Sequence, residues 1–379
     1  MKRSLLPVLV LFALSLASAS AAGAGIRHER GAHRHLFGPR HAVFVQTNEP
    51  SGNRILAYAR AGDGTLTPAG SYATGGNGAV EDGAVADTLA SQGSLAYDPA
   101  HHLLFAVNAG SDTVSTFLAV GTRLLRLQVV PSGGPFPTSV AVHGDLVYVL
   151  DAGGSGTVQG YRILFGLFLV PIPHGSRTLG LGNADTPDFL SSPGQVGFTP
   201  DGRRLIVTTK ASTSSIDVFR VEWDGRLGAA PVTNASAVPV PFGFVFDPAG
   251  RLVDAEAGGS AVTTYTLGAD GKLSNPQSLG DGQAALCWIT SAGGFYYASN
   301  TGSDTVSGYR IDASGAPSLL GTPVPTDGGP IDAAASGDFL YVQTGVGGTI
   351  DEFAVGSDGS LSSVGQATAV AGMEGIAAT

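Results

Sequence analysis

The chain has 379 residues, of which 56 are glycine and only 13% are charged. A hydrophobic content of 43% excludes an intrinsically disordered chain, which needs low hydrophobicity and high charge, and the lack of a Gly-X-Y period excludes collagen. The single cysteine, Cys287, excludes an internal disulfide and a cysteine-based zinc site. A net charge of −10 argues against nucleic acid as a partner. Many short apolar runs separated by glycine are typical of an all-β protein.

The N-terminus has the pattern of a secretory signal peptide. Lys2 and Arg3 precede an apolar run over residues 5–16, and small residues follow at 17–22. Such a run is too short for a transmembrane helix, which needs about 20 residues. We therefore predict a signal peptide over residues 1–22, a secreted or otherwise extracytoplasmic protein and no membrane span. An uncleaved signal that tethers the chain is the alternative.

Residues 23–41 hold four arginines and four of the chain's eight histidines. A His-rich tract can bind metal, but we interpret this stretch as a solvated basic linker. Beyond it the chain has 14 basic and 29 acidic residues, so the predicted folded part is strongly acidic. This charge favours solubility and disfavours anionic partners.

The rest of the sequence consists of seven repeats. Segments 108–117 and 300–309 share seven of ten residues, and weaker copies lie at 48–58, 151–161, 210–219, 256–265 and 344–353. Each copy ends at an aromatic residue, and these are Tyr58, Phe117, Tyr161, Phe219, Tyr265, Tyr309 and Phe353. Insertions around 76–94 and 166–194 lengthen two of the intervals.

Each repeat predicts four antiparallel strands. An inner run such as 140–142 is apolar on both faces, and a turn leads from it to a second strand rich in β-branched and aromatic residues, such as 146–150. A polar loop then leads to the third strand, and a turn such as Asp358-Gly359 opens the fourth. Four strands in each of seven repeats predict a seven-bladed β-propeller, as a single domain over residues 42–379.

The two ends of the repeat array predict how the propeller closes. Residues 41–45 align with second strands, so the first repeat lacks an inner strand, whereas residues 374–379 look like an inner strand without a repeat of its own. Placing this C-terminal strand in blade 1 closes the ring and removes exposed sheet edges. The alternative is two unrelated β domains, which does not explain why one repeat lacks an inner strand while the C-terminus has an extra one.

Several phrases of the sequence resemble a known family. They lie at 195–202, 241–248 and 282–288 and in the two Asn-x-Gly-Ser-Asp-Thr-Val-Ser loops, and Tyr-Val-Gln-Thr at 341–344 is similar to Tyr-Val-Thr-Asn-type propeller repeats. Together they resemble the bacterial β-propeller lactonase family, which is related to 6-phosphogluconolactonase and to the fungal carboxy-muconate cyclase. The resemblance covers all seven repeats. It implies a small-molecule substrate, a lactone that is hydrolysed or formed at the mouth of the central channel.

The loops between second and third strands, with the connections between blades, ring that mouth. Lys210 and Glu256 stand out because each replaces the Asn of its repeat with a longer ionisable side chain. A lactonase needs a base to activate water and a cation or hydrogen-bond donor to stabilise the oxyanion. We therefore predict Glu256 as the base, with Lys210 and Asn300 as stabilising groups. The predicted substrate-binding residues are Asn48, Asn108, Asp151, Gln195 and Arg54, and Asp332 and Glu374 also come from connections.

Structural interpretations of the same residues stay open. Asn and Asp in such loops also satisfy backbone donors in turns, and Lys210 with Glu256 can form a plain ion pair. An aspartate-rich mouth can hold Ca²⁺, so Ca²⁺ is a candidate cofactor. The acidic insert at 81–87 is a second candidate cation site, but its composition predicts a solvated loop. We interpret Cys287 as inert packing.

The sequence also departs from its enzymatic relatives. The resemblance implies histidine and arginine near the starts of inner strands, but His101, His102 and His143 fall in turns on the opposite face. Arg54 is the clear arginine of the top face, and a phosphorylated substrate would need an arginine cluster. 6-Phosphogluconolactone is therefore not favoured. We predict a monomer, and a non-catalytic ligand- or protein-binding scaffold is the alternative function.

Overall fold

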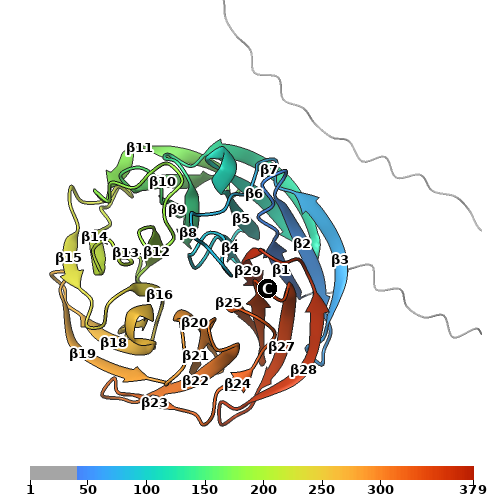
Figure 1. Ribbon diagram of the computed structural model, residues 1–379. Coiled ribbons are helices and arrows are strands. Elements are labelled where there is room, and N and C mark those ends of the chain that lie inside the picture. Colours follow the sequence, from blue (N-terminus) through green and yellow to red (C-terminus); the bar gives the residue numbers. More distant parts are fainter. Residues whose placement is uncertain (1–40) are drawn as a thin grey trace, which may run out of the picture. The chain divides into compact units, whose positions relative to one another are not determined.

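The computed structural model describes residues 41–379, which form seven antiparallel sheets arranged as blades around a central axis (Figure 1). The only helical segments among these residues are two 3-10 turns, η1 (Ala109–Ser111) and η2 (Ala257–Gly259), and no helix in this range could span a bilayer. The predicted seven-bladed β-propeller is confirmed. The signal peptide predicted over residues 1–22 lies outside the described residues. So does the linker predicted over 23–41, except for its last residue, His41.

The blades are numbered from the one that contains β1. Blade 1 comprises β29 (Glu374–Ala378), β1 (Ala42–Gln46), β2 (Arg54–Arg60) and β3 (Leu66–Ala73). Blade 2 comprises β4 (Leu95–Asp98), β5 (Leu103–Asn108), β6 (Thr113–Val120) and β7 (Arg123–Pro131). Blade 3 comprises β8 (Pro137–His143), β9 (Leu146–Asp151), β10 (Thr157–Leu164) and β11 (Phe168–Thr178).

Blade 4 comprises β12 (Pro193–Phe198), β13 (Arg204–Thr209), β14 (Ser215–Arg220) and β15 (Val232–Ala235). Blade 5 comprises β16 (Pro241–Phe246), β17 (Leu252–Glu256), β18 (Ala261–Leu267) and β19 (Leu273–Gly280). Blade 6 comprises β20 (Leu286–Ala292), β21 (Phe295–Asn300), β22 (Thr305–Ile311) and an outer strand in two pieces, β23 (Pro317–Leu319) and β24 (Val324–Pro325). Blade 7 comprises β25 (Pro330–Ser336), β26 (Phe339–Thr344), β27 (Thr349–Val355) and β28 (Leu361–Thr368).

The C-terminal strand closes the ring as predicted. β29 pairs antiparallel with β1, with Phe44 opposite Ala377, so blade 1 is built from both ends of the described chain (Figure 1). The backbone N–H of Thr379 donates to the carbonyl oxygen of Ala42 at 2.9 Å. Blade 1 therefore has an inner strand, and its second strand has no open edge.

The apolar core lies between adjacent blades. One cluster, for example, joins Phe44 of blade 1 to Leu104 and Phe117 of blade 2. The seven aromatic residues that end the repeats are all buried, with at most 3% of their surface exposed. They therefore act as interblade anchors, which explains why the repeats end at them.

Hydrogen bonds between blades repeat around the ring. The Tyr341 hydroxyl of blade 7 donates to the carbonyl oxygen of Gly64 in blade 1 at 2.8 Å, and Tyr297 donates to Gly359 of blade 7 at 2.9 Å. Tyr148 donates to Gly225 of blade 4 in the same way, at 2.5 Å. In each case a second-strand tyrosine contacts the turn that opens the fourth strand of the next blade.

Residues 87–94, here named the plug, fill the centre of the ring. The Gln92 side chain exchanges two hydrogen bonds with the backbone of Ile289 in blade 6, at 2.8 and 3.0 Å. The Gln92 backbone N–H donates to Gly194 of blade 4, and the Ser91 hydroxyl donates to Thr138 of blade 3. The plug thus ties together the inner strands of blades that are far apart in the sequence.

The carboxyl groups predicted from the blade connections hold the plug in place. Asp332 accepts the backbone N–H of Gly93 at 3.2 Å, and Glu374 accepts the Thr88 hydroxyl at 2.9 Å. Glu81 and Asp87 of the acidic insert are also buried, at 1% and 5% exposure. The interpretation of this insert as a solvated loop is therefore wrong for Glu81 and Asp87, whereas Asp82, Gly83 and Val85 between them are exposed.

Candidate functional site

A cavity of about 430 Å³ lies over the plug, on the face where the inner strands begin. Loops after the second strands of blades 4–7 form its sides, and the plug forms its floor. The lining is mostly apolar, with Lys210, Asp87, Thr301 and Asp304 as its polar exceptions. The apolar lining residues include Val85, Ala86, Ala90, Phe189, Leu190, Val240, Phe242, Cys287, Trp288 and Val346. A pocket with these proportions suits a small, largely apolar ligand.

Lys210 brings an amine to the cavity wall although its side chain is buried. Its Nζ donates to the carbonyl oxygen of Ala90 at 2.6 Å and lies 5.0 Å from the centre of the Phe242 ring. The Oε2 atom of Glu81 is 4.0 Å away. Burial lowers the pKa of this amine, and the nearby carboxyl groups of Glu81 and Asp87 oppose the shift.

Glu81 is the buried partner behind Lys210. Its Oε2 accepts the Ser192 hydroxyl at 2.8 Å, whereas Oε1 has no hydrogen-bond partner among the described residues. Burial raises the pKa of Glu81 to about 8, although the charge of Lys210 lowers it. Glu81 is therefore largely a neutral acid at pH 7, next to an amine whose pKa is depressed.

Asp87 and Glu374 form a carboxyl pair at the floor. Asp87 Oδ1 and Glu374 Oε1 both accept the backbone N–H of Leu89, at 2.9 and 3.0 Å. Burial raises the pKa of both groups, and the neighbouring Asp87 raises that of Glu374 further. Glu374 therefore holds a proton that the Asp87 carboxylate can share, as in other paired carboxyl groups.

Aromatic rings and a thiol form one wall. The Phe242 and Trp288 ring centroids are 4.8 Å apart in an edge-on arrangement, and the Trp288 indole N–H donates to Ser91 of the plug at 3.0 Å. Burial raises the pKa of Cys287 to about 12, so its thiol stays protonated. This wall offers a bound ligand a large apolar contact surface and few polar groups.

Glu256, the predicted base, points into the blade and is not among the residues that line the cavity. Its carboxyl group accepts hydrogen bonds from the hydroxyls of Thr263 and Tyr265 and from the backbone N–H of Val238. Burial raises its pKa. The structure therefore brings Lys210 to the cavity without Glu256.

Asn300 and Asn108 occupy the same register position as Glu256 in their blades. The Asn300 side chain donates to Thr305 and Ser307, and that of Asn108 donates to Thr113 and Ser115. Both residues are fully buried and tie the second strand to the third. Neither lines the cavity.

The other four predicted binding residues also lie away from the cavity lining. Asn48 donates to Ala79 and to Thr88, and so holds the segment that leads to the plug. Gln195 accepts the backbone N–H of Phe244 at 2.6 Å, between blades 4 and 5. Arg54 donates to Ser71 on the outer strand of blade 1, and Asp151 is buried in blade 3.

Sequence reasoning missed Asp87, Phe242 and Trp288 as site residues. Asp87 lies in the insert that the sequence predicts as a solvated loop, and the two aromatic residues lie in the segments 241–248 and 282–288, which carry the family resemblance but no site prediction. One signal was available, since Phe242 and Trp288 occupy the starts of neighbouring inner strands, where larger side chains reach the top face. The path of the plug had no such signal, because the repeats do not contain it.

Residues 41–379 contain no group of three or more His, Cys, Asp or Glu side chains placed to hold a metal ion. The Ca²⁺ expectation therefore stays a prediction without a site in this part of the chain.

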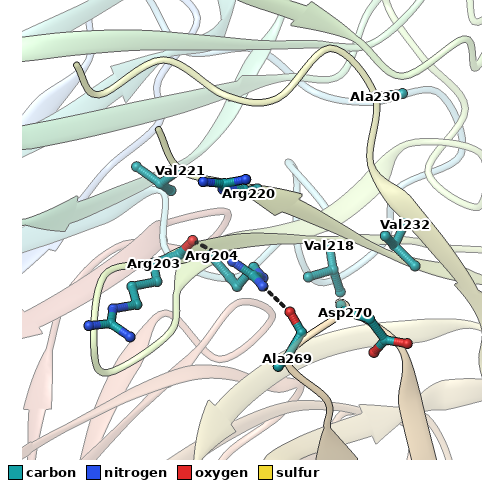
Figure 2. Close-up of a pocket in the computed structure, with 10 residues that line it drawn as sticks. Arg203, Arg204, Val218, Arg220, Val221, Ala230, Val232, Ala269 and Asp270 are labelled. Carbon is teal, nitrogen blue, oxygen red and sulfur yellow. Dashed lines mark hydrogen bonds between the residues drawn. The ribbon is translucent and has the colours of Figure 1, made fainter. Parts of the chain in front are cut away.

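A second hollow lies at the outer edge of blades 4 and 5 (Figure 2). It measures about 730 Å³ and is lined by Arg203, Arg204 and Arg220 together with Asp270 and several valines. Arg204 donates to the carbonyl oxygens of Ala269 and Arg203 (Figure 2). Three arginines thus meet in this hollow, and no arginine lines the cavity over the plug.

Comparison with solved structures shows the same fold. A periplasmic gluconolactonase from Pseudomonas aeruginosa, PpgL, superposes with a TM-score of 0.70 at 16% identity, over 89% of this chain and 99% of that one. A proposed 6-phosphogluconolactonase from Bacteroides uniformis gives 0.68 at 19% identity, again over 89% and 99%. No family model and no curated protein matches the sequence.

The chain is thus a seven-bladed β-propeller of the kind found in these proteins. The resemblance noted in the sequence to the β-propeller lactonases is confirmed at the level of the fold.

Proposed function

We propose that the protein binds a small neutral lactone in the cavity over the plug and hydrolyses its ring. The observation that carries the proposal is a buried amine and a carboxylate, Lys210 and Asp87, on the walls of one apolar cavity. The gluconolactonase and the proposed 6-phosphogluconolactonase with the same fold support the reaction class. Since no arginine lines the cavity, the substrate is an unphosphorylated one.

Asp87 and Lys210 have different roles in the proposed hydrolysis. Asp87 takes a proton from the attacking water, because its raised pKa makes it a better base than an ordinary aspartate while protonated Glu374 supports its carboxylate. Lys210 donates an N–H to the carbonyl oxygen, on which negative charge develops. Asp87 replaces Glu256 in this proposal, because Glu256 does not line the cavity.

We also propose that the protein is exported. The N-terminal sequence pattern supports this location, and the Pseudomonas aeruginosa protein of the same fold is named as periplasmic. Export would separate the protein from phosphorylated cytosolic sugars, in agreement with an unphosphorylated substrate.

The test is a panel of γ- and δ-lactones with different ring substituents, followed by pH-stat titration of the purified protein. Asp87→Asn and Lys210→Met should each lower kcat/KM by about 100-fold or more. In the unmodified protein kcat/KM should rise with pH through the raised pKa of Asp87. Arg220→Ala, in the hollow of Figure 2, is the control that should keep full activity. Hydrolysis that survives both site substitutions would place the chemistry elsewhere.

A non-catalytic binding protein is the second candidate. It is favoured by the anchoring of Asp87, whose two carboxylate oxygens accept the backbone N–H groups of Leu89 and Ser91 at 2.9 and 3.0 Å. These bonds occupy positions that a catalytic water would use. A silent lactone panel, combined with a rise in Tm on adding an apolar non-lactone ligand, would support this function.

A further inference from the structure

Lys210 has an environment that the proposed hydrolysis does not require. Among the described residues, the Ala90 carbonyl oxygen is the one group that accepts a hydrogen bond from its Nζ. An ammonium ion has three N–H donors, so two of them lack a hydrogen-bond acceptor among these residues, and the other groups near Nζ are the Phe242 ring at 5.0 Å and Glu81 at 4.0 Å. The amine also lies on the wall of a cavity large enough for a small ligand.

The charged groups near Lys210 do not cancel the effect of its burial. The carboxyl groups of Glu81, Asp87 and Asp188 favour the charged amine, in decreasing order, but burial outweighs them and lowers the pKa of Lys210, and the protonated Cys287 thiol carries no charge. Glu81, the nearest carboxyl group at 4.0 Å, is itself largely a neutral acid because burial raises its pKa to about 8. A desolvated lysine with a lowered pKa, placed on the wall of a cavity, is a nucleophile toward carbonyl carbon.

We propose that Lys210 captures aldehydes and ketones that carry an apolar substituent, as imines within the cavity over the plug. This activity goes beyond ring hydrolysis, because a lactone attacked by an amine would give an amide and an alcohol instead of an imine. The apolar walls formed by Phe242, Trp288 and Val346 select the substituent.

The chemistry balances without an added reagent. The nitrogen lone pair forms the C–N bond, the carbonyl π bond breaks onto oxygen, and one N–H proton moves to that oxygen. The carbinolamine then loses its hydroxyl group with the second N–H proton as water, which leaves a C=N bond. Glu81 is the carboxyl group nearest to Nζ, at 4.0 Å, which is longer than a direct hydrogen bond. One carbonyl compound is consumed and one water is released.

The lysine content of the chain makes the test simple. The whole sequence has only three lysines, Lys2, Lys210 and Lys272, and Lys272 is exposed in the turn between β18 and β19. Lys272 is therefore an internal reference for a solvent-exposed lysine. Labelling at either residue can be read by peptide mass mapping.

The experiment treats the purified full-length protein with hexanal and sodium cyanoborohydride at pH 7, so that any imine is reduced to a stable secondary amine. Lys210 should be alkylated faster than Lys272, because burial lowers the pKa of Lys210 and the apolar cavity holds the aldehyde beside its amine. In guanidinium chloride the two lysines should react alike. With glyceraldehyde, a polar aldehyde, the preference for Lys210 should shrink.

Two variants complete the test. Lys210→Met should abolish labelling at this position and leave that of Lys272 unchanged, and Lys272→Arg should leave labelling of Lys210 unchanged. Equal or slower labelling of Lys210 in the folded protein would overturn the proposal, as would a preference that persists in denaturant. Trapping at Lys210 with a silent lactone panel would contradict the proposed hydrolysis alone, so the two failures are distinguishable.

Discussion

Buried carboxyl groups set the electrostatic character of individual residues in this protein. Burial raises the pKa of Glu81 and Asp151 to about 8 and that of Asp332 to about 7. Each of these groups binds its proton more tightly in the folded state than in the unfolded state. The stability that protonation provides is therefore present at low pH and lost as the pH rises through the folded-state pKa.

Asp151 allows this linkage to be tested away from the proposed site. Neither of its carboxylate oxygens has a hydrogen-bond partner among the described residues, and the nearby Ser132 hydroxyl donates to Gly134 instead. Its folded pKa of about 8 lies above its ordinary value of 3.8, so the free energy of unfolding should fall between about pH 4 and pH 8. Asp151→Asn cannot ionise and should raise stability at pH 8.5 by at least ~1 kcal/mol.

The measurement is urea denaturation of both proteins at pH 5 and pH 8.5. Asp312→Asn is the matched control, because Asp312 is fully exposed and its pKa is lowered by hydrogen bonds from Ser314 and Ala316. This control should leave the pH dependence above pH 5 unchanged. An Asp151→Asn protein with the same pH slope as the parent would show that Asp151 is ionised when buried.

At the scale of the strand and loop, one residue of loop length decides which side chain reaches the cavity. Asn108 pairs with Thr113 and Glu256 pairs with Ala261, each five positions later, whereas Thr209 pairs with Ser215, six positions later. Thr209 therefore holds the register position that the sequence alignment gave to Lys210. The extra loop residue moves Lys210 out of the strand and over the plug.

The same comparison shows what the sequence could and could not predict. Repeat spacing gave all seven blades and the C-terminal closure, because apolar strand patterns and Asp-Gly turns are local signals. It placed Lys210 at the channel mouth, but it could not predict which way the side chains of Glu256, Asn300 and Asn108 point. These polar residues satisfy strand-to-strand hydrogen bonds in the blades, and nothing in their spacing separates that role from ligand binding.

The turn glycines that the tyrosines contact give a testable packing requirement. Gly64 has φ +92°, and a Cβ there would lie 2.2 Å from the Phe339 ring of blade 7. Gly250 has a similar φ of +79° but open space around its Cβ position. Gly64→Ala should lower the free energy of unfolding by about 2–4 kcal/mol, as the sum of backbone strain and overpacking.

Gly250→Ala is the control, since it carries the strain alone and should cost about 1 kcal/mol. Both values come from urea denaturation monitored by circular dichroism. Equal costs for the two substitutions would mean that the contact between Gly64 and Phe339 relaxes freely, so that backbone strain alone makes glycine necessary there.

At the scale of the whole molecule, two features connect blades that are far apart in the sequence. β29 supplies the inner strand of blade 1, and the plug bonds to inner strands of blades 3, 4, 6 and 7. Glu374 belongs to both features, because it lies on β29 and accepts hydrogen bonds from Thr88 and Leu89. Ring closure and the floor of the cavity are therefore coupled.

Truncation after Gly372 tests this coupling. It removes β29 together with Met373, Ile376 and Ala377, which are 0%, 5% and 6% exposed. Loss of two large buried apolar side chains alone costs about 4–10 kcal/mol, comparable with the whole stability of a typical domain, ~5–15 kcal/mol. The truncated protein should therefore lose its cooperative thermal transition in calorimetry and expose the edge of β1.

A circular permutant tests whether ring closure depends on β29 itself or on where the chain begins and ends. The backbones of Thr379 and Ala42 are hydrogen-bonded at 2.9 Å, so a short glycine linker can join residue 379 to His41. New chain ends are then opened in the exposed turn between Ala313 and Ser314. This permutant keeps β29 beside β1 and should unfold cooperatively with a Tm near that of the parent residues 41–379. A truncated protein as stable as the permutant would mean that blade 1 holds without its C-terminal strand, and that the plug and Glu374 are not needed to keep the ring closed.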